Sequence, residues 1–331
     1  MAVSIEDIKK LRAMTGAGLA DVKKALTEAE GDFDKAKELL RERGLAIAAK
    51  RSDRETSNGC VLVKKVNDFA AIIALKCETD FVANGADFIK LTSDILDAAI
   101  AAKAQTLDEV KALKVGESDA QAAVTQRSGI TGEKMELDGY CVLEGDNIEV
   151  YDHMNKHTLC TMVQLNENNA EAGHKVAMQV AAMRPVALDE SSVSEETKKT
   201  ELEVAVAKTK EELVEKAVNA ALKKAGINPA HVDSEEHIES NTKKGWLTPE
   251  QAEEARNIKK TVGEEKAATL NPTMIQNIAN GRLAKFFKEN CLVDQEFQFG
   301  DGDKQTVAQY LASQSKDLKI VAYKRFTLAA E

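Results

Sequence analysis

The chain has 331 residues, a net charge of −10, 30% charged residues and only 4% aromatic residues. This composition is typical of a soluble, helix-rich protein with two or more domains, and it excludes a disordered chain. The acidic balance disfavours nonspecific attachment to nucleic acid or to an anionic membrane, because both carry negative charge.

Residues 1–50 predict a small bundle of three helices. Glycine-containing breaks at 15–18 and at 31–32 separate three segments whose apolar residues recur at helical spacing. The residues expected to face inward are Ile5, Ile8, Leu11 and Met14 in the first helix, Leu19, Val22, Leu26 and Ala29 in the second, and Phe33, Ala36, Leu39 and Leu40 in the third. So small a core has marginal stability by itself, which favours a docking module over an enzyme.

Two later stretches repeat one order of elements, after a polar linker at 51–58. β-Branched and apolar runs indicate strands, and longer stretches of helical periodicity indicate helices. The strands are expected at 60–63 and 69–75 with a helix at 87–103, and then at 140–143, 148–151 and 158–165 with a helix at 169–183. Strands followed by a helix, twice, predict two related α+β units.

Residues 187–290 predict a helical insertion. Ser194 precedes a long run rich in Glu, Lys, Ala and Val, and Gly226 ends it. Thr248-Pro249 and Asn271-Pro272 each place a capping residue before a proline, which is a strong signal for a helix start. An antiparallel hairpin is one arrangement of these helices. Strands are expected again near 296–299 and 319–328.

Side chains that could carry chemistry are few. His153, His157 and Cys160 have a spacing that could suit zinc, but they span an expected hairpin turn and lack a fourth ligand, so we expect no metal there. Gly300-Asp301-Gly302-Asp303 lacks the glutamate that completes a calcium loop, which favours a simple turn. Phosphate-binding glycine motifs and a nucleophile elbow are also missing from the sequence. We therefore expect neither a cofactor nor an enzyme.

Cysteine spacing and hydropathy indicate the cellular compartment of the protein. The five cysteines are odd in number and form no C-x-x-C pair, which favours reduced thiols over a disulfide framework. The sequence contains no run of about 18 apolar residues and no charged-then-apolar leader. We expect a cytoplasmic protein.

Two motifs resemble signatures of the elongation factor Ts family. The stretch at 11–26, LRAMTGAGLADVKKAL, resembles the N-terminal signature, and CETDFVAN at 77–84 resembles the second one. A softer match is VAMQVAA at 176–182. The resemblance covers residues 1–186 well and resumes weakly near 282–299 and 321–326.

The resemblance implies an α+β fold and a particular division of the chain into domains. Residues 1–50 would form a ubiquitin-associated-like three-helix module and 51–58 a linker. Residues 59–135 would form one core subdomain, and 136–186 with 291–331 the other. The stretch 187–290 would be a coiled-coil insertion in the second subdomain.

The resemblance also implies a function and its residues. Members of the family bind elongation factor Tu, in GDP-bound and nucleotide-free forms, and promote GDP release. The residues implied to contact that partner are Thr79, Asp80, Phe81 and Val82, together with Arg12, Leu19, Lys23 and His153. A phenylalanine displayed after a strand can anchor an interface, and Asp80 could accept backbone N–H bonds that fix its presentation. From spacing alone, Phe81 could equally pack against its own helix start.

Some positions depart from the family pattern. Ala74 and Lys76 stand where the family usually has Glu and Asn, and Gln179 replaces a frequent His. The insertion is longer than the compact family form, and we expect the C-terminal helical module of some members to be missing.

The rival prediction is a passive adaptor that uses the N-terminal module and the coiled coil without the 79–82 turn. We expect no membrane partner and no direct nucleic-acid binding. The long capped helices of the insertion also suggest self-association.

Overall fold

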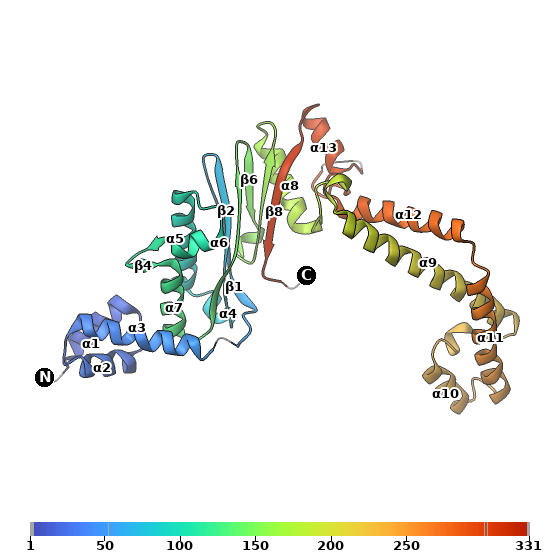
Figure 1. Ribbon diagram of the computed structural model, residues 1–331, viewed down its shortest axis with the longest axis horizontal. Coiled ribbons are helices and arrows are strands. Elements are labelled where there is room, and N and C mark those ends of the chain that lie inside the picture. Colours follow the sequence, from blue (N-terminus) through green and yellow to red (C-terminus); the bar gives the residue numbers. More distant parts are fainter. Residues whose placement is uncertain (1–2, 52, 301, 303, 330–331) are drawn as a thin grey trace. The chain divides into compact units, whose positions relative to one another are not determined.

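The computed structural model describes residues 3–51, 53–300, 302 and 304–329. The protein mixes helices and sheets, as expected. It divides into two compact units, one formed by Met1–Leu188 with Glu296–Glu331 and the other by Asp189–Gln295 (Figure 1).

The first unit begins with α1 (Ile5–Thr15), α2 (Leu19–Glu28) and α3 (Phe33–Ala49). Ser4 caps α1 by accepting a hydrogen bond from the backbone N–H of Asp7, and Gly16 ends the helix with φ +67°. The buried residues of these helices are Ile8, Leu11, Ala17, Val22, Ala25, Leu26, Ala29 and Ala36.

Three residues expected in this core lie outside it. Ile5 is 72% exposed, Met14 53% and Leu19 58%. The prediction was wrong for them because each lies in the first or last turn of its helix, where the neighbouring helices do not cover it. Met14 and Leu19 thus leave apolar surface on either side of the turn at 16–18.

A three-stranded antiparallel sheet follows, with strand order β1-β2-β5. Its strands are β1 (Asn58–Val66), β2 (Phe69–Cys77) and β5 (Met135–Glu144), and two short strands, β3 (Lys114–Val115) and β4 (Ser118–Asp119), form a small ribbon. The structure differs here from the expected division at residue 136, because β5 pairs with β2 and belongs to the first sheet. Hydrophobic patterning identified the strand but carried no information on its partner.

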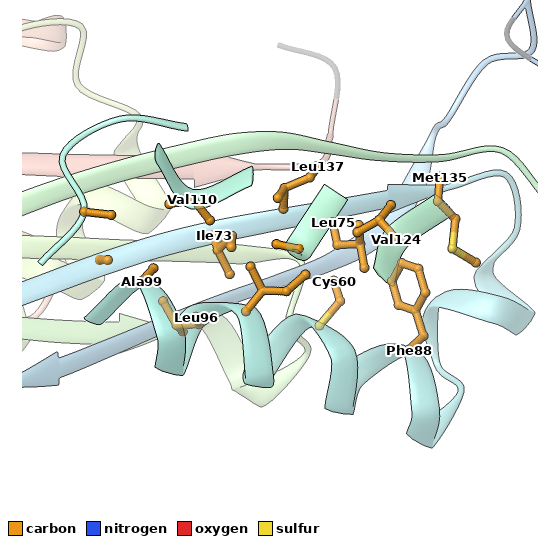
Figure 2. Packing of buried hydrophobic residues seen from close by; sticks show 14 of the residues in the cluster. Cys60, Ile73, Leu75, Phe88, Leu96, Ala99, Val110, Val124, Met135 and Leu137 are labelled. Atoms are coloured by element: carbon orange, nitrogen blue, oxygen red, sulfur yellow. The ribbon is translucent and has the colours of Figure 1, made fainter. Parts of the chain in front are cut away.

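Helices α5 (Ala86–Ala102), α6 (Leu107–Ala112) and α7 (Ala120–Thr131) contribute the side chains that bury one face of this sheet. Figure 2 shows Phe88, Leu96 and Ala99 of α5 facing Ile73 and Leu75 of β2. The opposite face carries residues such as Val61 and Ile72 and packs against the second sheet. Because both its faces are covered, β2 is apolar almost throughout and does not alternate.

The second sheet has the order β6-β7-β8, again antiparallel. Its strands are β6 (Ile148–Asp152), β7 (Leu159–Leu165) and β8 (Ile320–Thr327), and a one-turn helix η1 (His153–Asn155) follows β6. Helices α8 (Ala170–Met183) and α13 (Val307–Gln314) complete this part. The strand expected at 296–299 is only one bridge, between Glu296 and Thr306.

The departures from the family pattern have structural roles. Gln179 is fully buried in α8, where its Nε2 donates to the Glu296 carbonyl at 3.1 Å and its Oε1 accepts from the Gln298 N–H at 3.0 Å. Lys76 pairs with Asp138 at 2.5 Å across the β2-β5 ladder. Gln179 therefore ties the segment after residue 295 to α8.

The second unit is helical. It contains η2 (Glu190–Ser192), α9 (Glu195–Lys224), η3 (Pro229–His231), α10 (Glu235–Lys243), α11 (Pro249–Ala268) and α12 (Pro272–Asn290). Ser194, Thr248 and Asn271 cap α9, α11 and α12 as the sequence predicted. Helix α9 runs beside α12, with Glu212 paired to Arg282, and its C-terminal half packs on α11 (Figure 1).

All five cysteines are free thiols, and four of them are buried. Burial raises the pKa of Cys60 and Cys77 to about 12 and that of Cys141 and Cys291 to about 11. It also raises the pKa of Cys160. The reactive thiolate is therefore scarce near neutral pH.

We expect Ellman's reagent to react slowly with the native protein near pH 8 and with all five thiols after unfolding in guanidinium. Absorbance at 412 nm counts the released thiolate. Rapid labelling of several thiols in native protein would contradict the buried placement.

Candidate functional site

The turn between β2 and α5 carries the most unusual side chain of the first unit. Strand β2 ends at Cys77, and the chain then forms a four-residue helix, α4 (Asp80–Ala83), before α5 (Figure 1). Phe81 lies in this short helix and is 87% exposed. Packing against its own helix start, which spacing alone allowed, is thereby excluded. Among the large apolar side chains of the described residues, Phe81 is the most exposed.

Thr79 caps α4. Its backbone is extended (φ −121°, ψ 152°), and its Oγ1 accepts from the Val82 N–H at 3.4 Å. The expectation that the Asp80 side chain accepts these backbone bonds was wrong, because Asp80 is already the first helical residue and Thr79 is the cap. The Asp80 carbonyl instead accepts from the N–H and Nδ2 of Asn84 at 2.9 and 2.8 Å. The carboxylate of Asp80 is left exposed beside Phe81.

Two glutamates, one within the 77–84 motif and one outside it, hold the turn. The Glu133 carboxylate accepts from Thr79 twice, from the backbone N–H at 3.1 Å and from Oγ1 at 2.6 Å. Glu78 accepts from the Lys134 N–H at 2.6 Å and from Arg54 at 2.9 Å. Sequence reasoning missed Glu133, since it lies 54 residues from Thr79 and belongs to no quoted motif.

Val82 and Ala83 anchor the other side of α4. Ala83 is buried in the core of the first sheet, and Val82 packs against it. Within the 77–84 motif, Cys77, Glu78, Thr79, Val82, Ala83 and Asn84 thus each have a role in building the turn. Among the residues that the structure describes in this motif, Asp80 and Phe81 are the two whose side chains are left facing solvent without such a role.

The acid dependence of stability tests the Glu78 anchor. The pKa of Glu78 lies below its ordinary value, chiefly because its carboxylate accepts the Lys134 N–H and then because of Arg54. A lowered folded pKa means that the charged form stabilises the fold above the unfolded pKa of about 4.3, and that this contribution is lost as pH falls through the folded pKa.

We expect Glu78→Gln to be less stable than the unchanged protein near pH 7 in urea unfolding. The difference should be smaller at about pH 3, below the unfolded pKa of about 4.3, because the stabilisation by the charge of Glu78 declines as pH falls toward and through its lowered folded pKa. An equal difference at both pH values would mean that the charge of Glu78 does not matter.

The other implied contact residues lie on different elements. Arg12, Leu19 and Lys23 are exposed on α1 and α2. Leu19 is the one whose exposure contradicts its expected place in the core. His153 is half-buried in η1, and its Nδ1 lies 3.1 Å from the Tyr151 hydroxyl. The structure therefore places the implied contact residues on α1 and α2, on α4 with its cap, and on η1.

The side chains considered for zinc are engaged elsewhere. His157 Nδ1 lies 2.5 Å from Asp152 Oδ2, and the buried Cys160 donates to the Val61 carbonyl at 3.4 Å. Within residues 3–51, 53–300, 302 and 304–329 there is no group of three or more His, Cys, Asp or Glu placed to hold a metal. Of the turn at 300–303, Asp301 and Asp303 lie outside the described residues. In that described part, no helix has the length and hydropathy needed to cross a bilayer.

The structure is thus that of an α+β protein whose first unit carries an exposed phenylalanine on a short helix with fixed hydrogen bonds. A family model described as "Elongation factor TS" matches residues 78–330. The chain therefore belongs to the elongation factor Ts family.

Individual relatives agree over full length. The chain is 62% identical to "Elongation factor Ts" of Bacteroides fragilis over 332 residues, covering 100% of both chains. It is 60% identical to the protein of that name in Parabacteroides distasonis and 39% identical to that of Porphyromonas gingivalis, each over 100% of both chains. These alignments therefore include residues 189–295, the helical second unit.

Proposed function

We propose that this protein is a guanine-nucleotide exchange factor that binds elongation factor Tu and promotes GDP release, so that GTP can rebind during translation elongation. Membership of the elongation factor Ts family supports the exchange role. The single observation that carries it in this chain is Phe81, 87% exposed on a short helix held by hydrogen bonds from both ends.

Exchange needs no bond to be made or broken. Phe81 inserts into the partner and buries roughly 150–250 Å² of its own surface, with Asp80 beside it. A factor that binds the nucleotide-free partner more tightly than the GDP form must weaken GDP binding by the same ratio. Displacing partner groups that hold the magnesium ion and the phosphates would achieve this. The protein itself needs neither a cofactor nor catalytic residues, and it acts in the cytoplasm.

We further propose the domain organisation that the resemblance implies, with β5 assigned to the first subdomain. Residues 1–50 act as a ubiquitin-associated-like docking module, joined by 51–58 to a core of two related subdomains. The exposed Arg12, Leu19 and Lys23 support docking by α1 and α2. His153 would contact another domain of the partner.

The function is tested by the release of fluorescent GDP from cognate elongation factor Tu, with and without this protein. Saturable acceleration is expected. Binding without acceleration would favour the passive adaptor, in which the 79–82 turn is silent. Absence of binding would overturn both readings.

Self-association through 187–290 remains a separate proposal. Met274 and Ile278, one turn apart on α12, are 40% and 37% exposed, and such an apolar stripe supports it. Deleting 190–275 should reduce the oligomeric mass measured by light scattering to that of a monomer. An unchanged oligomeric state would rule the proposal out.

A further inference from the structure

Helices α3 and α7 touch through their backbones. A Cβ built on Gly129 of α7 would lie 2.2 Å from the Cα of Gly44 in α3, and 3.1 and 3.2 Å from its carbonyl carbon and oxygen. Backbone cannot rotate away as a side chain can, so any larger residue at 129 must separate the helices. This crossing attaches α3, and with it α1 and α2, to the helical layer of the first sheet.

The contact is not symmetric. A Cβ built on Gly44 would lie 3.5 Å from the Cα of Gly129, which is an ordinary van der Waals distance. Neither glycine has a positive φ, so conformational freedom is not why either is needed. The geometry therefore predicts that alanine is tolerated at 44 and excluded at 129.

A cavity lies beside the crossing of α3 and α7. Leu40 of α3 and Gln126 and Ile130 of α7 line a cavity of about 230 Å³, together with Thr15 and Gly18 beside the α1-α2 turn. Next to this cavity, the backbone contact between Gly129 and Gly44 helps to hold the N-terminal helices in place.

The same, C-terminal end of α7 leads directly to the residue that holds the Phe81 turn. Helix α7 ends at Gly132, with φ +72°, and Glu133 follows directly. The Glu133 carbonyl accepts from the Ser128 hydroxyl of α7 at 2.5 Å. The Glu133 carboxylate accepts hydrogen bonds from the backbone N–H and the hydroxyl of Thr79. Arg127 Nη2 lies 3.0 Å from Asp87 Oδ2 and ties α7 to α5. The C-terminal end of α7, together with Glu133 just after it, thus connects to both the N-terminal helices and the Phe81 turn.

We propose that α7 is a common support that fixes the N-terminal helices relative to the Phe81 turn, with Gly129 and Glu133 as positioning residues. This rests on the proposed exchange function. The two surfaces that bind elongation factor Tu are then held at a fixed distance from each other before binding. Binding therefore does not have to restrict their relative motion, which would cost conformational entropy. Gly129 governs binding through the N-terminal helices, and Glu133 governs how Phe81 acts once bound.

The test measures GDP release from elongation factor Tu against the concentration of each variant. Gly129→Ala should raise the half-saturating concentration roughly tenfold and leave the maximal release rate unchanged. The N-terminal helices would then be joined to the core only by the flexible chain, so they would add less to the affinity for the partner. Gly44→Ala is the matched control and should behave as the unchanged protein. Gly44→Leu separates the helices without altering α7 and should match Gly129→Ala. Glu133→Gln should instead lower the maximal rate several-fold.

A second readout needs no partner. Spin labels on Lys24→Cys and Glu117→Cys, both exposed, report the separation of the N-terminal helices from the core. The distance distribution should broaden in Gly129→Ala and not in Gly44→Ala. Identical exchange curves and distances for these two variants would overturn the proposal. If the unchanged protein fails to accelerate GDP release, the proposed exchange function is wrong. The distances between the spin labels would still show whether Gly129 fixes the N-terminal helices against the core.

Discussion

Phe81→Ala is expected to abolish most of the acceleration of GDP release while leaving the fold intact. The side chain is 87% exposed, so removing it deletes almost no intramolecular packing. As an interface anchor it should be worth about 2 kcal/mol or more in the complex, which corresponds to about 30-fold or more in exchange efficiency. Unfolding free energy should change by less than about 0.5 kcal/mol.

The measurements are fluorescent GDP release and urea unfolding of the same preparation. Val66→Ala is the control, because Val66 is also an exposed apolar residue (41%) but lies at the far end of β1 from the turn. It should leave release unchanged. If Phe81→Ala retained full exchange, the proposal that Phe81 inserts into the partner would be wrong. The passive adaptor would then be the better-supported hypothesis.

Phe88→Ala should have the opposite profile. Seven residues further along, this phenylalanine is fully buried on α5, against β2 (Figure 2). Its removal costs the transfer free energy of the ring and leaves a cavity, together about 3–5 kcal/mol of stability. At a temperature where the variant is still folded, exchange should stay within a few-fold of normal.

Guanidinium unfolding gives the stability, and circular dichroism selects the temperature for the exchange assay. Phe88→Leu, which keeps much of the volume, should recover part of the loss. A destabilisation below about 1 kcal/mol for Phe88→Ala would show that the α5 face is packed more loosely than the structure has it.

The two phenylalanines show what separates sequence from structure at this site. Both follow β2 within twelve residues, and periodicity placed Phe88 inward correctly. For Phe81 spacing left two readings, and only the burial of Val82 and Ala83 beside it decided that its ring faces solvent. The family signature named the residue, and tertiary packing determined its exposure.

The sequence by itself determined the mixed fold, the capped starts of α9, α11 and α12, and the family motifs at 11–26 and 77–84. These are local properties, because caps and hydrophobic periodicity act within a few residues along the chain.

Only the tertiary structure decided that β5 pairs with β2, that Glu133 holds Thr79, and that Gly129 meets Gly44. Each of these contacts joins residues between 54 and 85 positions apart (129 minus 44 is 85). At such separations, the sequence does not indicate which distant residue a strand edge, a carboxylate or a glycine Cα will contact. Such pairs form because burial of the common core brings distant segments together, and that long-range packing has no signature in a single sequence.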